Sequence, residues 1–117
     1  MTTIDRYRSA SATLFDQAMI ELKAGDVQQA SEKLRGSVAQ ALEAAAQERG
    51  WEHGTHAESY RIVRRLIHET GRREIRDGLK TASVLYQNFY ENWMLEPEVR
   101  RDSTQVRALL DILAEVG

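Results

Sequence analysis

The stretch Gly25–Gly50 reads GDVQQASEKLRGSVAQALEAAAQERG, and helix-forming residues fill it between one glycine and the next. Asp26 is a favourable N-cap, because its carboxylate can accept a hydrogen bond from the free backbone N–H of Gln29. Gly50 is a favourable stop, because glycine adopts the left-handed conformation after a last helical turn. Small residues recur along the predicted helix and let another helix approach closely. These are Gly36, Ser37, Ala39, Ala41 and Ala44 to Ala46.

Helix-forming segments separated by residues that begin or end helices also lie on both sides of this stretch. Apolar residues recur at helical spacing in four further segments, and no segment alternates as a strand would. Capping-box pairs precede two of the segments, and glycine or proline separates the others. Five helices with short turns predict an all-α, up-and-down four-helix-type bundle, in one domain of residues 1–117. The expected helices cover residues 4–24, 26–49, 55–70 and 72–93, with a last one starting at Pro97.

Composition excludes several classes of protein. The chain has 117 residues, which suits one domain, and it contains no cysteine. The lack of cysteine removes disulfides, thiolate metal sites and cysteine nucleophiles, and it predicts a cytoplasmic location. No apolar run approaches the length of a membrane span, and no signal-peptide core begins the chain. We therefore expect no membrane partner.

The charges are unevenly distributed, although the net charge is only −2. Residues 61–80 contain seven Arg or Lys and three acids, whereas residues 81–117 contain three bases and six acids. This polarity predicts either one basic and one acidic face or two helices with ordinary solvated charge.

The segment Arg61–His68, RIVRRLIH, is the first candidate site. Arg61 and His68 lie seven residues apart, so a helix would place them within about 20° of one another. Arg64 and Arg65 lie between them. Guanidinium groups can bind phosphate oxygens and an imidazole can move a proton, which is what metal-independent RNA cleavage requires. The alternative is an exposed basic stripe without chemistry.

The segment Leu85–Trp93, LYQNFYENW, is the second candidate. Four aromatic residues lie within eight positions, and the spacing of Tyr86, Phe89 and Trp93 predicts that they pack in the core. Tyr90 lies beside that stripe, and aromatic faces can also stack on bases. An amide such as that of Asn88 must either face water or find a partner.

The three histidines form only a weak pattern for metal binding. His53 and His56 fall in and beside a turn, and His68 is remote from them in the sequence. Zinc requires three or four ligands in tetrahedral geometry. We therefore predict no metal and no cofactor.

Several of these segments, taken in order, resemble the PaREP family of small prokaryotic proteins, which belongs with the HEPN superfamily of helical bundles. The resemblance implies an up-and-down bundle that dimerises. Many HEPN domains are RNases of toxin–antitoxin, CRISPR-linked or phage-defence systems, and others are inactive partners of minimal nucleotidyltransferases. The resemblance spans roughly residues 10–117. It rests on residues 29–42, Arg49-Gly50-Trp51, His56, Glu69-Thr70-Gly71 and residues 85–93.

The HEPN catalytic signature is an arginine, one hydrophobic or polar residue, four to six further residues and then a histidine. Arg61 and His68 match it in spacing, but they fall on the third predicted helix, whereas active members carry the signature on the last core helix. We therefore expect a non-catalytic module that acts by homodimerisation or partner binding, with nucleotide or RNA as candidate ligand. A metal-independent endoribonuclease using Arg61 and His68 is the alternative. The candidate contacts to nucleotide or RNA are Arg61, Arg64, Arg65, Asn88 and Tyr90.

Overall fold

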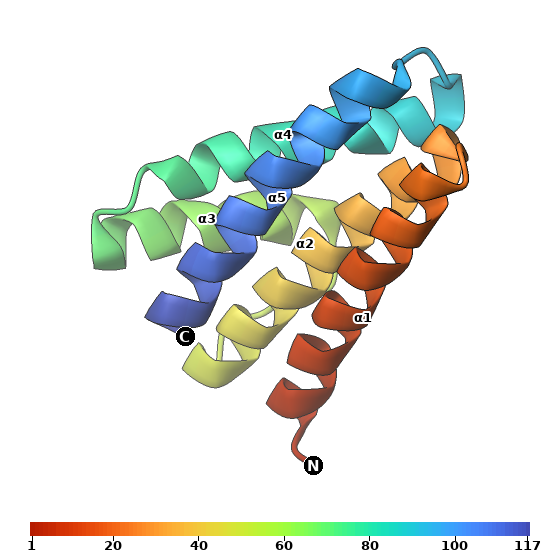
Figure 1. The fold of residues 1–117 in the computed structure, drawn as a ribbon. Coiled ribbons are helices and arrows are strands. Elements are labelled where there is room, and N and C mark those ends of the chain that lie inside the picture. The colour runs from red at the N-terminus through yellow and green to blue at the C-terminus, as the bar shows by residue number, and fades with distance from the viewer.

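The computed structural model describes residues 1–117 as five helices without strands (Figure 1). The predicted all-helical class is therefore confirmed. None of the five helices is both long enough and apolar enough to cross a membrane. The helices are α1 (Thr3–Lys23), α2 (Val27–Arg49), α3 (His56–Thr70), α4 (Glu74–Glu91) and α5 (Glu96–Val116).

The predicted helix starts are confirmed where a side chain caps them. The Thr2 hydroxyl accepts from the backbone N–H of Asp5 at 3.1 Å, and the Asp5 carboxylate accepts from the N–H of Thr2. The hydrogen bonding with Thr2, above all the bond that its backbone N–H donates to the carboxylate, lowers the pKa of Asp5. Thr55 and Glu58 form the same reciprocal pair at the start of α3. Each pair satisfies donors that a helix leaves free at its first turn.

Two predicted helix ends are confirmed, whereas one predicted end and one predicted start are corrected. Gly50 and Gly71 adopt the left-handed conformation, with φ of 72° and 74°. The predicted extension of α4 to Trp93 is wrong, because Asn92 turns left-handed at φ 51° and ends the helix at Glu91. Pro97 is the second residue of α5 rather than its first, since the helix begins at Glu96.

Helix α2 lies at the centre of the fold and packs on all four other helices. In Figure 1, α1 runs beside α2, and α5 crosses in front of α4. Helices α1 and α5 both pack on α2 but scarcely touch each other, which leaves part of α2 uncovered between them. The core is almost entirely aliphatic, so its stability comes from removing apolar surface from water. Its most deeply buried members are Leu22, Leu34, Leu42, Ile62, Leu66, Ile75, Leu85 and Leu109.

The aromatic residues of α4 do not fill the core as predicted. Tyr86 is 36% exposed and Trp93 is 47% exposed. The buried side of α4 instead runs through Ile75, Leu85 and Asn88. Trp93 leaves the core stripe because the helix has already ended, and Tyr86 lies at the edge of the buried face.

Candidate functional site

The basic residues predicted on α3 lie on its exposed side. Arg61, Arg64, Arg65 and His68 are all exposed, and none of them forms an ion pair. The Arg65 guanidinium lies 4.5 Å from the centre of the Trp51 ring, a cation–π geometry.

Only part of this basic set is brought together. Arg61 and Arg65 line a cleft of about 110 Å³ with Trp51 and Glu52. His68 is not among the lining residues, and no hydrogen bond joins it to Arg61. The cleft can therefore offer two guanidinium groups to a ligand, while the imidazole lies elsewhere on the helix.

Asn88 has a structural place inside the fold. Its side chain is fully buried, and its Nδ2 donates to the Ser31 hydroxyl at 2.7 Å. Its Oδ1 accepts from the backbone N–H groups of Trp93 at 2.9 Å and Met94 at 2.7 Å. Both polar atoms of the amide are thus engaged where the chain leaves α4, and its burial keeps Asn88 from reaching a ligand at the surface.

Tyr90 belongs to a group of rings that we name the tyrosine cluster, formed by Arg35, His56, Tyr60, Tyr86 and Tyr90. Ring centres lie 5.2 Å apart for Tyr60 and His56, 6.1 Å for His56 and Tyr86, and 5.2 Å for Tyr86 and Tyr90. The rings come from α3 and α4, and the Arg35 side chain comes from α2 with its guanidinium 5.3 Å from the Tyr86 ring centre. Three tyrosines are thus contiguous on the surface, with exposed fractions from 36% to 66%.

The tyrosine cluster carries both signs of charge and neutral rings. Arg35 forms an ion pair with Glu32, one turn away on α2. Its Nε is the one buried side-chain nitrogen or oxygen without a hydrogen-bond partner. The hydrogen bond with the Tyr86 hydroxyl raises the pKa of Tyr90, and the nearby charge of Glu32 adds to this shift.

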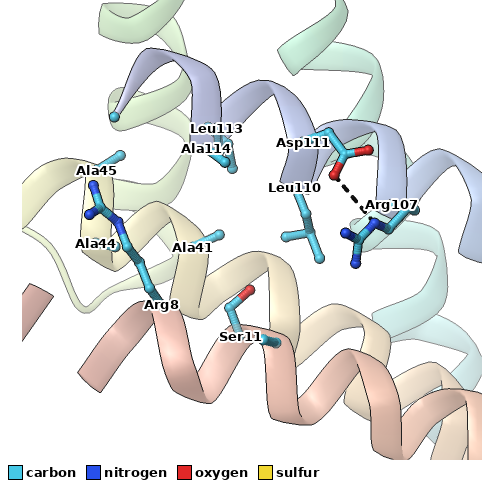
Figure 2. Close-up of a pocket in the computed structure, with 12 residues that line it drawn as sticks. Arg8, Ser11, Ala41, Ala44, Ala45, Arg107, Leu110, Asp111, Leu113 and Ala114 are labelled. Atoms are coloured by element: carbon cyan, nitrogen blue, oxygen red, sulfur yellow. Dashed lines mark ion pairs between the residues drawn. The ribbon is translucent and has the colours of Figure 1, made fainter. Parts of the chain in front are cut away.

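A pocket of about 220 Å³ opens between α1 and α5, where α2 is uncovered (Figure 2). We name it the α1–α5 pocket. Its floor consists of alanines of α2, which leave the space because their side chains end at Cβ. Figure 2 shows the side chains of α1 and α5 facing each other across this floor. The apolar lining residues are Ala12 of α1, Ala41, Ala44 and Ala45 of α2, and Leu110, Leu113 and Ala114 of α5.

An arginine stands at each end of the α1–α5 pocket (Figure 2). At one end, Arg8 donates to the Glu48 carboxylate at 3.1 Å. At the other end, the Arg107 guanidinium pairs with Asp111 at 3.3 Å and lies 5.4 Å from the centre of the Phe15 ring. Both guanidinium groups are about half exposed and can contact a bound molecule.

No group of three or more His, Cys, Asp or Glu side chains is placed to hold a metal ion. His53 is held by the polar side chains of α2. Its Nδ1 contacts the Glu43 carboxylate, and its Nε2 contacts Gln47 Oε1 at 2.9 Å. These contacts fix the connection between α2 and α3.

The chain is a small all-helical protein with a central helix, a surface cluster of rings and an arginine-ended pocket. Residues 6–110 match the model of the archaeal PaREP1/PaREP8 family, and the chain belongs to that family. No curated protein and no solved structure gives a significant match.

Proposed function

We propose that this chain is a non-catalytic, HEPN-like helical module that acts as a homodimer through its tyrosine cluster. The observation that carries the proposal is the contiguous run of exposed rings on α3 and α4 beside the guanidinium of Arg35. Tyrosine and arginine are enriched at protein interfaces and dominate their binding energy. The five-helix fold and the family membership support the HEPN-like assignment.

The charges of the tyrosine cluster favour a second copy of the chain as its partner. A two-fold interface brings the same surface patch from both subunits together, so that patch must be complementary to itself. Arg35 and Glu32 place one charge of each sign beside the rings, and Arg35 of one copy can pair with Glu32 of the other. The Glu32 carboxylate also disfavours a polyanion at this patch.

Sedimentation velocity on two charge variants of α4 tests this interface. Tyr90→Glu places a carboxylate at the most exposed ring of the cluster, and we expect it to raise the dimer dissociation constant about a hundredfold. Val84→Glu is the matched control, because Val84 is also exposed and lies about 120° around the same helix. A wild-type protein that is monomeric at all concentrations, or equal effects of the two variants, would contradict the proposal.

The α3 basic residues support nucleotide or RNA as the ligand of the dimer. Arg61, Arg64 and Arg65 have no ion-pair partner within the chain and are free to meet phosphate oxygens. Of the two other predicted contacts, Asn88 is buried and Tyr90 lies in the tyrosine cluster and not beside these arginines. A filter-binding assay at two salt concentrations measures this contact, and replacement of Arg64 by Ala should weaken binding at low salt. A minimal nucleotidyltransferase partner and a cytoplasmic location stay predictions.

A metal-independent endoribonuclease is the second candidate function. The observation that favours it is that Arg61 and His68 are both exposed on α3, with neither side chain engaged in an ion pair. Labelled single-stranded RNA in EDTA should then be cleaved by the wild type and left intact by His68→Ala and Arg61→Ala. Arg73→Ala is the matched control, since Arg73 is exposed and unpaired at the start of α4. Cleavage that survives the His68 substitution would remove this assignment.

A further inference from the structure

We propose that the α1–α5 pocket binds a short organic carboxylate, with its apolar chain on the alanine floor and its carboxylate at Arg8. The pocket shares no residue with the tyrosine cluster, so this binding does not depend on the proposed dimer. Its three structural elements are an apolar floor, two apolar walls and a guanidinium group at each end (Figure 2).

The apolar lining of the pocket favours a ligand with an apolar hydrocarbon chain. Alanine and leucine side chains from three helices line the pocket between its charged ends. The one hydroxyl there, that of Ser11, already donates to the Ser37 carbonyl at 2.7 Å. A polar ligand would therefore leave its own groups unpaired against this floor, whereas an alkyl chain gains from leaving water.

The two ends of the pocket differ in charge, and the difference places the carboxylate. At the Arg107 end, the paired Asp111 carboxylate itself lines the pocket and would repel an anion. At the Arg8 end, the partner Glu48 does not line the pocket, and its carboxylate also lies 4.0 Å from Arg49. Inside the pocket, Arg8 therefore acts without a neighbouring acidic side chain in the lining, and it keeps N–H donors beyond the one that Glu48 uses.

The size of the pocket limits the ligand to a small molecule. Pockets that enclose drug-sized ligands measure about 300–1,000 Å³, and this one measures about 220 Å³. A nucleotide or a bulky ring system would exceed it. A short unbranched chain can lie along the floor between the two arginines.

Calorimetric titration of the full chain with sodium octanoate, below its micelle concentration, tests the pocket. 1-Octanol is the uncharged matched probe and should bind about tenfold more weakly. We expect Arg8→Gln to weaken octanoate about tenfold and to leave octanol unchanged, whereas Arg107→Gln should change octanoate less than about threefold. Equal affinity for the two probes, or loss of octanoate in Arg107→Gln alone, would overturn the proposal.

A second pair of variants separates the pocket from unspecific binding on exposed rings. Ala12 is exposed at the rim of the pocket, so Ala12→Leu fills the space without disturbing the core. Ala108 is exposed on α5 outside the pocket, and Ala108→Leu adds the same side chain there. Octanoate binding should be lost in the first variant and kept in the second. Binding that survives Ala12→Leu would place the ligand elsewhere and contradict the assignment, whatever the oligomeric state.

Discussion

The tyrosine cluster and the α1–α5 pocket are built on the same central helix, yet the cluster exposes large rings around a hollow of only about 50 Å³, whereas the pocket measures about 220 Å³. Ala44 of α2 faces the pocket, and Val38 lies six residues earlier, beneath the rings, about 120° around the helix. On the pocket side, alanines lie beneath two helices that scarcely meet. On the cluster side, α3 and α4 contact each other and place large rings over the seam between them.

This difference shows how the neighbours of a helix decide what its surface can bind. A concave surface of small residues accepts a molecule that enters it, whereas exposed rings around a small hollow suit a broad partner surface. The two regions also differ in what holds them. A buried amide anchors the chain below the cluster, while surface ion pairs hold the ends of the pocket.

The largest expected effect comes from removing that buried amide. Asn88→Ala leaves the N–H groups of Trp93 and Met94 without an acceptor, and we expect the free energy of unfolding to fall by about 3 kcal/mol. Gln87→Ala changes the neighbouring exposed residue and should cost less than about 0.5 kcal/mol. Urea denaturation measures both values.

Amide hydrogen exchange on Asn88→Ala tests whether the cluster side and the pocket side unfold locally without each other. Faster exchange at the end of α4, with unchanged exchange at Ala41–Ala45, would show that the cluster side can loosen alone. Faster exchange in both places would show that the two regions unfold together as one cooperative unit. A loss of stability below about 1 kcal/mol would show that Asn88 does not anchor this side of the fold.

The next largest expected change in stability comes from substituting a helical glycine. Two such glycines, at the α4–α5 and α1–α2 contacts, allow the packing of these two helix pairs to be compared. A Cβ at Gly78 of α4 would lie 2.6–2.9 Å from three side-chain atoms of Leu109, so Gly78→Ala must displace α5. We expect it to destabilise the fold by about 1–2 kcal/mol after the gain in helix propensity. A Cβ at Gly36 would lie 3.2 Å from the Cδ1 of Leu14, a flexible side-chain end.

Gly36→Ala should therefore change the free energy of unfolding by less than about 0.5 kcal/mol in either direction. Thermal unfolding of both variants in one buffer measures the contrast. Equal destabilisation would mean that the α1–α2 seam is as tight as the α4–α5 seam. A stabilised Gly78→Ala protein would show that α5 can shift freely, and this would also weaken the assumption of a rigid pocket wall.

The helices could be predicted from the sequence because their signals are local. Thr2 with Asp5, and Thr55 with Glu58, act within one turn, and so does a glycine after a last turn. The end of α4 could not be predicted in this way. It depends on the amide of Asn88, which reaches forward to Trp93 and sideways to Ser31 of another helix.

The candidate sites were predictable only where they lie on one helix. Spacing alone placed Arg61 and His68 on the exposed side of α3, and Tyr90 beside Tyr86. Neither region compared above follows from spacing, because each joins residues that are far apart in the chain. Arg35 meets Tyr86 across 51 positions, which only the packing of α2 on α4 brings together. The small residues of α2 did indicate a close helix contact, but not that part of them would stay uncovered.

The smallest expected effect concerns an ion pair between the C-terminal ends of α2 and α3, one turn of α2 beyond Ala45 of the pocket floor. Arg49 donates to Glu69 of α3 at 2.7 Å, to the Val116 carbonyl of α5 at 2.8 Å and to the Ala45 carbonyl below the pocket at 3.1 Å. Its guanidinium lowers the pKa of Glu69 below the ordinary value of 4.5. This pair therefore stabilises the fold above the ordinary pKa, and the contribution disappears as the pH falls through the lower folded value.

Glu69→Gln should accordingly cost stability at pH 7, and the cost should shrink as the pH falls through the lowered pKa of Glu69. Urea denaturation across this range measures the difference between the two proteins. Glu91→Gln, an exposed acid without an ion pair, should show no such trend. A constant difference at every pH would mean that Glu69 acts through packing and not through its charge. A difference that shrinks with falling pH, together with faster exchange at Ala45 in the variant, would show that the charge of Glu69 holds Arg49 in place and thereby steadies the end of α2 beside the pocket.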